Sequence, residues 1–380
     1  MRVERRQWKS GLGWSAGSTE PLAGDAQVVF VFGAGAHLKD PARIKDIREM
    51  YPRALRVGCS TAGEIFDVNV SDETLVASAL ALDKGRVVPV LVPVPSPAES
   101  RRAGEALAAG LPPEGLVHVV VLSDGLHVNG SDLVRGLTSG LPRGVRVTGG
   151  LSADGDRFVE TGVLLGDDFH SRAVVGIGFY GERLRVGFGS LGGWDTFGPR
   201  RLITKSNGNV LECLDGKSAL EIYKNYLGEY ASGLPATGLL FPLAIQRPQD
   251  PEVLVRSVLA VDEIKGTMTF AGDMPEGCLA QFMMANFDRM VDGAESAAGH
   301  AKIGFGASDA EWALLISCVG RKLILKQRVE EEVEAVRDVL GPRPVLVGFY
   351  SYGEIAPFRP DARCDLHNQT MTITTFTEIP

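Results

Sequence analysis

Residues 347–357, VGFYSYGEIAP, join an apolar strand pattern to a turn made of glycine, hydroxyl groups and a carboxylate. A strand that ends in such a turn is suited to presenting polar groups, because glycine lets a ligand approach the backbone closely. Residues 57–65, VGCSTAGEI, carry the same Val-Gly and Gly-Glu-Ile at matching places. In both cases a second run headed by threonine follows, at 74–83 and at 370–378. The sequence therefore predicts two related halves.

A longer repeat surrounds these turns. The order strand, helix, strand, polar turn, strand, strand occurs twice between residues 28 and 180 and is approached again by the last unit, 312–378. Mixed order of this kind predicts an α/β to α+β fold, with layered sheets covered by helices and much antiparallel pairing. The expected strands are 28–32, 54–59, 74–83, 87–94, 117–122, 145–147, 158–165, 173–180, 238–245, 253–261, 267–271, 312–318, 345–349 and 370–378. The expected helices are 41–50 with Asp40 as N-cap, 98–109, 131–137, 218–227, 287–298 and 322–340.

Three further segments define the predicted domain organisation. Residues 1–25 lack a clear period and are expected to form a loosely structured lead-in. Glycine-rich residues 191–215 predict a boundary region, which divides the chain into domains at 26–210 and 211–380. The acidic run 330–332 is interpreted as a solvated helix face.

Composition excludes several classes of protein. The chain has 380 residues, 44% hydrophobic and 23% charged, as is typical of globular proteins with about two domains. No apolar run reaches the roughly 18 residues that span a bilayer, and no signal peptide is recognisable, so a cytoplasmic location without membrane contact is expected. A net charge of −8 with only short basic clusters argues against nucleic acid as a partner. Five widely spaced cysteines favour neither disulfides nor zinc.

The sequence resembles a known family at several separate motifs. YPRALR, VGCSTAGEI and SDETLVASAL resemble the N-terminal FIST domain, and LDGKSALEIY, CVGRKLIL, GFYSYGEIAP and LHNQTMTITT resemble the C-terminal FIST domain. The resemblance covers nearly everything after residue 26. It implies a sensory domain for small ligands, and some members of the family are haem-binding nitric-oxide sensors linked to histidine kinases. Haem enters through this resemblance alone.

Glu64 and Glu354 are the first candidates for ligand contacts. Each follows a glycine at the end of a strand, where a carboxylate suits an ammonium or guanidinium group. The alternative is that each glutamate satisfies amides in its own turn. The sequence alone favours neither interpretation over the other.

Cys59, followed by Ser60 and Thr61, is the candidate for an enzyme. A nucleophilic thiolate needs a nearby base or positive charge, and no histidine is close in the sequence. A buried, unreactive thiol is the favoured interpretation.

His127 and His367 lie in polar, turn-like sequence and are candidates for ligand contacts or an axial haem bond, against a structural role for each. No metal-binding motif and no covalent haem attachment motif is present, so neither a structural metal nor covalent haem is expected. The two Gly-Glu-Ile turns are expected to line one solvated pocket between the halves. The predicted ligand-binding residues are Cys59, Ser60, Thr61, Gly63, Glu64, Asp124, His127, Asp154, Ser351, Tyr352, Gly353, Glu354, His367 and Asn368.

These observations favour a sensor over an enzyme. We expect a cytoplasmic protein that binds a small ligand, such as an amino acid or similar metabolite, and signals in trans to a partner such as a histidine kinase. A haem-based nitric-oxide sensor and an enzyme that uses Cys59 or a strand-end carboxylate are the alternatives.

Overall fold

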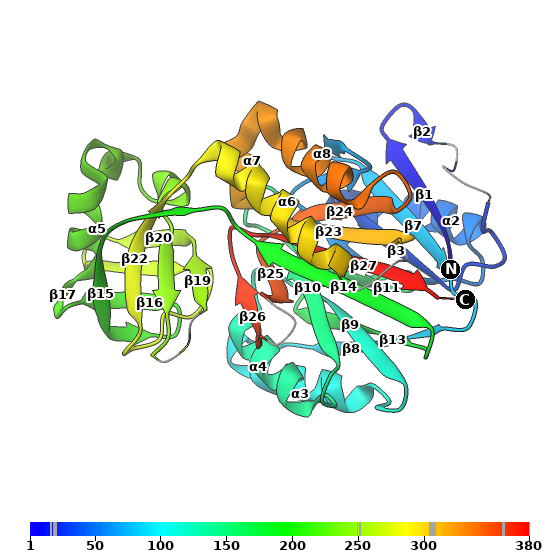
Figure 1. Cartoon of the computed structure of the whole chain (residues 1–380), viewed down its shortest axis with the longest axis horizontal. Helices are drawn as coiled ribbons and strands as arrows, with labels where there is room; N and C mark the ends of the chain where they lie inside the picture. Colours follow the sequence, from blue (N-terminus) through cyan, green and yellow to red (C-terminus); the bar gives the residue numbers. More distant parts are fainter. Residues whose placement is uncertain are drawn as a thin grey trace.

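The computed structural model describes residues 1–15, 17, 21–248, 250, 252–303, 309–358 and 362–379. Within these residues the strands pair into four sheets, three in a common core and one in a projecting domain (Figure 1). Strands and helices occur in layers, as the predicted α+β class requires. The repeat seen in the sequence occurs three times in the core, and the two Gly-Glu-Ile turns belong to its first and third copies.

The first unit begins earlier than the sequence suggests. Strand β1 pairs antiparallel with β7, so a loosely structured lead-in is the wrong description of its residues. Because of its arginines, the segment shows no apolar strand pattern in the sequence. In the structure one of these arginines lies over Phe66, and they bind acidic side chains. The elements are β1 (Arg2–Lys9), β2 (Gly13–Trp14), β3 (Val28–Gly33), α1 (Gly35–Leu38), α2 (Pro41–Met50), β4 (Leu55–Ser60), β5 (Glu64–Phe66), β6 (Asn69–Ser71) and β7 (Leu75–Ala81).

The second unit repeats this order with one added helix. Its first and second central strands are parallel and its last strand is antiparallel to the first, as in the first unit. The expected strand at 158–165 is confirmed only from Val163 onward. The elements are β8 (Arg86–Pro93), α3 (Ser100–Gly110), β9 (Leu116–Ser123), α4 (Gly130–Gly140), β10 (Arg146–Leu151), β11 (Val163–Leu165), β12 (Asp168–His170) and β13 (Ala173–Tyr180).

The third unit carries the projecting domain between its first strand and its first helix. The helix expected at 322–340 is broken at Lys326, whose φ of 52° does not belong to a right-handed helix. The elements are β14 (Leu184–Leu191), α6 (Phe287–Ile303), β23 (Trp312–Cys318), α7 (Val319–Leu325), α8 (Val329–Leu340), β24 (Val345–Ser351), β25 (Gly353–Pro357), β26 (Cys364–His367) and β27 (Met371–Glu378).

The inserted domain contains the fourth sheet and one α-helix. Much of the expected boundary region is one long strand, β15, whose glycine and proline accompany a register shift against β22. The expected strand at 238–245 is a 3₁₀ helix followed by a short strand, and the hairpin through 263–267 is confirmed. The elements are β15 (Asp195–Asn207), β16 (Val210–Leu214), β17 (Lys217–Ser218), α5 (Ala219–Leu227), β18 (Leu243–Gln246), β19 (Val253–Arg256), β20 (Val258–Asp262), β21 (Thr267–Phe270) and β22 (Leu279–Met284).

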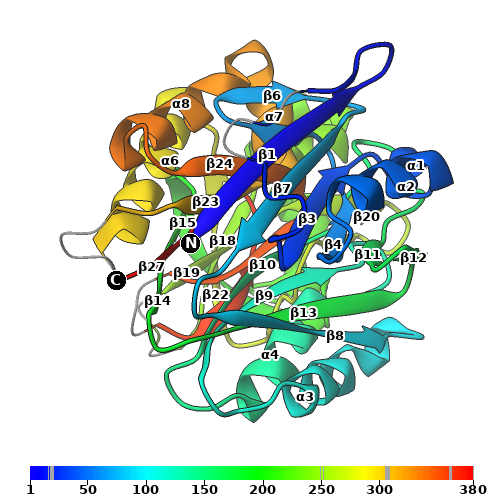
Figure 2. The ribbon, with the colours of Figure 1, turned by 90° about the vertical axis from the view of Figure 1, so that its right-hand side faces the viewer.

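The hairpin of each unit pairs with a strand of a neighbouring unit. The hairpin strand β5 of the first unit pairs with β24 of the third, β11 of the second pairs with β4 of the first, and β25 of the third pairs with β10 of the second. The exchange closes a cycle, and Figure 2 shows the helices of the three units on three different sides of the core. No unit therefore completes its sheet alone.

The middle of the core is apolar and contains residues of all three units. The ring of Phe30 lies 4.9 Å from that of Trp312, and the ring of Phe179 lies 4.8 Å from that of Phe376. The aromatic rings thus fill the space between the three sheets. Among the described residues, no helix is long and apolar enough to cross a membrane.

Candidate functional site

Glu64 and Glu354 are held by the same set of hydrogen bonds. Thr61 donates to Glu64 Oε1, while the amide and the hydroxyl of Thr74 donate to Oε2 at 3.0 and 2.6 Å. Ser351 donates to Glu354 Oε1 at 2.5 Å, and the amide and hydroxyl of Thr370 donate to Oε2 at 3.2 and 2.9 Å. Both side chains are buried. Each glutamate therefore fastens its own turn to the strand that follows.

Burial also changes the charge of these carboxyl groups. It raises the pKa of Glu64 to about 7 and the pKa of Glu354 to about 8, although the surrounding hydrogen bonds act in the opposite direction. The expectation that these carboxylates face a solvated cleft is wrong, because both side chains are buried and accept hydrogen bonds from their own turns and from the threonines that follow.

In the second unit, Asp124 is the carboxylate that accepts a hydrogen bond from the residue before the last strand. Its carboxylate accepts from the amide of Arg172, which stands just before β13 as Thr74 and Thr370 stand before β7 and β27. It also accepts from the amides of Leu126 and His127 and from the hydroxyl of Thr161. Burial alone would raise the pKa of Asp124, but these donors outweigh it and lower the pKa. The second unit thus supplies the same kind of acceptor from a different strand.

The three turns meet through a ring of backbone hydrogen bonds. The amide of Ala62 donates to Tyr350 at 2.9 Å, and the amide of Ala153 donates to Ser60 at 2.9 Å. The amide of Tyr352 completes the ring by donating to Leu151 at 3.1 Å. The predicted proximity of the Gly-Glu-Ile turns is confirmed, and the turn at residues 152–155 joins them.

Asp154 and Tyr352 connect the second turn to the third. The carboxylate of Asp154 accepts from the amides of Phe158, Val159 and Glu160 and from the Tyr352 hydroxyl. Burial would raise the pKa of Asp154, but these bonds lower it. The Tyr352 ring stacks on Phe158 at 4.6 Å. Asp154 therefore shapes its own loop, as a structural residue would.

Cys59 lies in β4 with no exposed surface. Burial raises the pKa of its thiol well above the ordinary value. Among the described residues, no hydrogen bond joins it to a histidine. This environment suits an apolar side chain better than a nucleophile.

Gly63 and Gly353 are closely surrounded by other side chains of the protein. A Cβ at Gly63, where φ is 135°, would lie 2.6 Å from the Lys322 ammonium. A Cβ at Gly353 would lie 3.0 Å from the side chain of Leu366. Neither glycine leaves open space for a ligand at this position.

The core and the inserted domain meet where residues 366–369 contact Arg256 and Ser257, and we call this contact the seam. It contains buried polar groups. At His367, Asn368 and Gln369 three consecutive side chains are fully buried, and each has a polar atom without a partner in the described part of the chain. His367 Nε2 lies 2.7 Å from the carbonyl of Ala356 and must donate to it, so Nδ1 is an unpaired acceptor. Burial lowers the pKa of His367 to about 4, which keeps the ring neutral. With Asn368 Oδ1 and Gln369 Oε1, the seam holds three unpaired acceptors.

Arg256 and Ser257 of the inserted domain lie across this seam. Gln369 Nε2 is 2.9 Å from Ser257 Oγ, and Arg256 donates to the carbonyl of Leu366 at 3.0 Å. Arg256 is buried, and burial lowers its pKa to about 10. No carboxylate among the described residues forms an ion pair with Arg256. The sequence prediction missed Arg256 and Gln369; the polar run HNQT between two apolar strands was the available signal.

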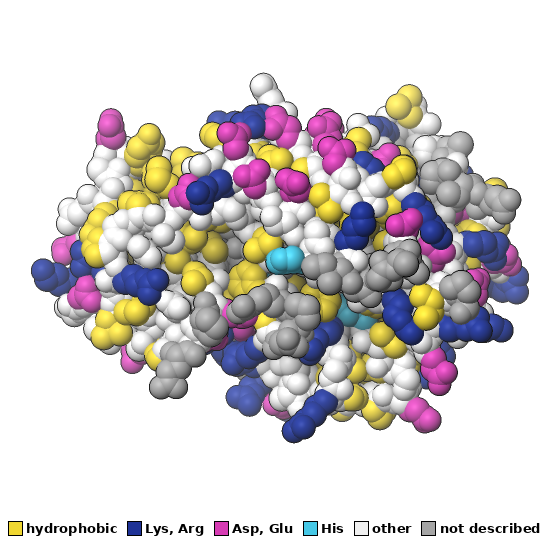
Figure 3. All heavy atoms as spheres, viewed as in Figure 1, with side chains coloured by type: hydrophobic (Ala, Val, Ile, Leu, Met, Phe, Trp, Pro, Cys, Tyr) yellow, Lys and Arg dark blue, Asp and Glu magenta, His cyan; other side chains and the backbone are white. Residues whose placement is uncertain are grey.

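Two ion pairs also join the inserted domain to the core. Arg247 makes two bonds of 2.9 Å with Asp365, and Arg135 of α4 binds Asp273 at 2.7 Å. The surface shown in Figure 3 intersperses basic and acidic side chains, without a continuous basic area. The seam is thus a defined interface between two bodies rather than an open basic groove.

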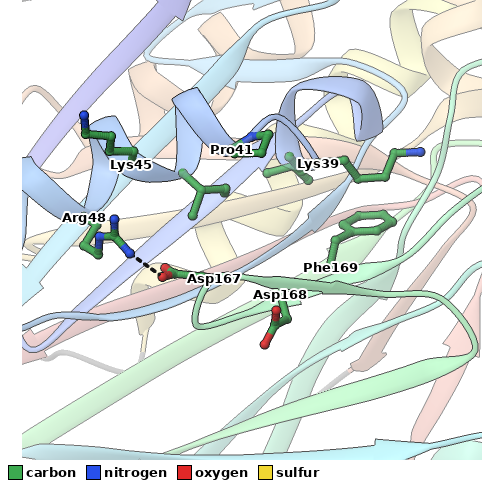
Figure 4. Close-up of a pocket in the computed structure, with 9 residues that line it drawn as sticks. Lys39, Pro41, Lys45, Arg48, Asp167, Asp168 and Phe169 are labelled. Atoms are coloured by element: carbon green, nitrogen blue, oxygen red, sulfur yellow. Dashed lines mark hydrogen bonds and ion pairs between the residues drawn. The ribbon is translucent and has the colours of Figure 1, made fainter.

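A separate cavity of about 300 Å³ lies between helix α2 and the hairpin β11–β12 (Figure 4). Pro41, Ile44, Lys45 and Arg48 of the helix face Asp167, Asp168 and Phe169 of the hairpin. Arg48 reaches across to Asp167 at 2.9 Å. None of the predicted site residues lines this cavity.

The two histidines predicted as haem ligands do not fit that role. His127 Nδ1 lies 3.1 Å from Asp124, and the His367 ring packs against Phe358 with 4.1 Å between the ring centres. The cavity beside α2 is lined by no histidine, cysteine or methionine. The described residues include no cluster of histidine, cysteine and acidic side chains that could hold a metal ion.

Comparison with known proteins identifies the chain by two adjacent matches. Residues 27–217 match the FIST N domain and residues 219–357 match the FIST C domain. No curated protein matches the chain. A solved structure of cyanuric acid hydrolase from A. caulinodans matches at 10% identity over 78% of this chain and 100% of that chain, with a TM-score of 0.19, which is too low to indicate a shared fold. The two matches cover most of the 380 residues, so the chain belongs to the FIST family, whose domains are sensory domains implicated in signal transduction and small-ligand binding.

Proposed function

We propose that this protein is a sensor that binds a small ligand at the seam between its core and its inserted domain. The observation that carries the proposal is the set of unpaired acceptors on His367, Asn368 and Gln369. Buried polar groups nearly always have partners, and an unpaired one costs about 1 to 3 kcal/mol. Three in succession indicate a place where a molecule other than the protein supplies the donors.

An amino acid or similar metabolite has the chemistry that this seam would recognise. Its ammonium group offers three N–H donors to the acceptors, while its carboxylate suits the guanidinium of Arg256. Arg256 forms no ion pair among the described residues, and its guanidinium donates to the carbonyls of Asp273, Val255 and Leu366. A ligand carboxylate would give this buried charge a direct ionic partner. Both halves of the ligand would then be held by opposite sides of the seam.

Arg321 provides a route by which binding could reach the rest of the molecule. Its guanidinium donates to the carbonyls of Gly192 and Met290, which lie beside the outgoing and returning connections of the inserted domain. It also lies 3.5 Å from the carbonyl of Gln369. A ligand that moves Gln369 would therefore change how the inserted domain is held, and we propose that a partner protein such as a histidine kinase reads this change in the cytoplasm.

We propose that the protein acts by binding rather than by turnover. The enclosed thiol of Cys59 supports this view, as does the burial of Glu64 and Glu354, whose oxygens already accept hydrogen bonds from the protein. No described geometry favours the haem alternative.

Asn368→Ala provides a test, because Asn368 Oδ1 bonds to nothing in the described protein. The variant loses only the long hydrogen bond of 3.5 Å from Asn368 Nδ2 to the Tyr352 carbonyl, so we expect the ligand-free variant to melt within about 4 °C of the wild type. Native mass spectrometry of protein purified from its host should show a small noncovalent adduct on the wild type and much less on the variant. A large loss of melting temperature with an unchanged adduct would show that Asn368 is structural and would contradict the proposal. Exposed Arg102→Gln is the control.

A further inference from the structure

The polar groups of the seam are closed off from solvent. The side chains of His367, Asn368 and Gln369 have no exposed surface. On the other side of the seam, Arg256 is 2% exposed and Ser257 is 4% exposed. A molecule from solution can therefore reach these groups only when the contact between the inserted domain and the core opens.

Two short connections join the inserted domain to the core. Residues 192–194 lead from β14 to β15, and residues 285–286 lead from β22 to α6. The connections are adjacent, because Asp195 pairs with Met284 and binds Arg289 at 2.6 Å. Figure 1 shows both of them on the upper side of the molecule, with β26 and α4 below. Two adjacent connections of this kind have the geometry of a hinge.

The ion pairs with β26 and α4 hold the inserted domain against the core. Asp365 of β26 binds Arg247, and Arg135 of α4 binds Asp273. The side chains of Arg247 and Arg135 are 22% and 36% exposed. Because water and salt reach both pairs, each contributes only modestly to the contact. The two pairs can therefore break while the inserted domain and the core stay folded.

The apolar part of the same contact is small. Among the described residues, it consists of seven buried side chains, whereas the inserted domain has eighteen in a core of its own. The seven side chains are those of Trp194, Ala244, Val255, Met283, Met290, Ile324 and Leu325. Because the inserted domain buries more apolar side chains within itself than against the core, it can move as one body.

We propose that the inserted domain is a hinged lid, which turns about residues 192–194 and 285–286 and is held closed by the ion pairs of Arg247 and Arg135. When the lid opens, Arg256 leaves the carbonyl of Leu366 and Ser257 leaves Gln369. The seam is then open to solvent, and a ligand can enter before the lid closes over it. This entry route rests on the proposed function, whereas the opening of the lid does not.

Ser257→Cys places a thiol inside the seam, and Cys59, which has no exposed surface in β4, is the control in the same chain. The ligand-free protein is treated with N-ethylmaleimide, and labelling at the two sites is followed by mass spectrometry of its peptides. We expect the introduced thiol to react at least about tenfold faster than Cys59, because opening the lid costs less than unfolding the core. Equal rates at the two sites would overturn the proposal. Val255→Cys, in the apolar part of the contact, is a second reporter in case Ser257→Cys does not fold.

Asp365→Asn and Arg135→Gln each weaken one ion pair of the lid. We expect either change to speed labelling of the introduced thiol at least about threefold and to leave the rate at Cys59 unchanged. Arg48→Gln is the matched control, because it removes an ion pair with Asp167 within the core and should leave both rates unchanged. A rate at the introduced thiol that responds to neither Asp365→Asn nor Arg135→Gln would contradict the role of these pairs. All rates are measured without ligand, so they separate a failure of the lid from a failure of the seam to bind an amino acid.

Discussion

Arg321 and Glu332 form an ion pair in which neither side chain is exposed, with Arg321 Nη2 2.7 Å and Nε 2.9 Å from Glu332 Oε2. The other carboxylate oxygen accepts from Ser317 and Tyr350. The expectation that residues 330–332 form a solvated helix face is therefore wrong at Glu332. The pair joins the break between α7 and α8 to the connections of the inserted domain.

Removing one partner of this pair should be strongly destabilising. Glu332→Ala leaves a buried guanidinium without its carboxylate, and we expect a loss of about 3 to 5 kcal/mol in the free energy of unfolding. Urea denaturation measures the change. Neighbouring Glu331→Ala, at a side chain that is 42% exposed, should cost less than about 0.5 kcal/mol. Equal losses in the two variants would contradict the importance of the buried pair.

Stability should fall between about pH 5 and pH 8 because of Glu64 and Glu354. Their folded-state pKa values of about 7 and about 8 lie above the ordinary value of 4.5, so the folded protein binds these protons more tightly than the unfolded chain. The stabilisation that these two groups give the folded state is fully present below the ordinary pKa and is lost as the pH rises through their folded-state pKa values. A loss of up to about 3 kcal/mol for each group is expected.

Glu64→Gln and Glu354→Gln remove these titrations. Each variant should be less sensitive to pH than the wild type when unfolding is measured at pH 5 and at pH 8.5. Exposed Glu49→Gln should retain the full dependence. Identical pH profiles for all four proteins would show that the buried carboxyl groups do not titrate in this range.

Three glycines should resist substitution for one shared reason. A Cβ at Gly58, Gly149 or Gly348 would lie 1.8 to 1.9 Å from a carbonyl oxygen on the neighbouring central strand. Each alanine variant should lose more than about 4 kcal/mol or fail to fold. Gly299→Ala in α6, where nothing lies within 4 Å, should instead be neutral or stabilising by up to about 1 kcal/mol. Three well-folded variants would contradict the close strand packing.

Local features of the fold could be predicted from the sequence, whereas the exchange between units could not. Helix α2 begins at Pro41 with the Asp40 cap, as expected, because capping depends on adjacent residues. The hairpins pair with strands of other units, a choice made by packing over long separations rather than by local pattern. The repeated order of the second unit was recognised in the sequence, but the equivalence of Asp124 to the two glutamates was not, because Asp124 directly follows β9 and lies outside the glycine-acid turn.

In the candidate site, too, local features could be predicted from the sequence and long-range contacts could not. The hydroxyl, glycine and carboxylate of each turn were recognised, but their burial depends on neighbouring units that the pattern does not reveal. Arg256 comes from the inserted domain, more than one hundred residues before His367, so no spacing could join them. The assignment of Cys59, Ser60 and Thr61 to ligand binding stays a prediction, as do the domain boundaries at 26–210 and 211–380.

Calorimetric titration of the wild type and Arg256→Gln with the twenty amino acids tests the seam most directly. We expect at least one amino acid to bind the wild type in a one-to-one ratio and to bind Arg256→Gln at least about tenfold more weakly, because a charge-assisted bond is lost. Circular dichroism checks that the variant is folded. No binding to the wild type, or equal affinity in the two folded proteins, would contradict the seam as the site of an amino-acid ligand.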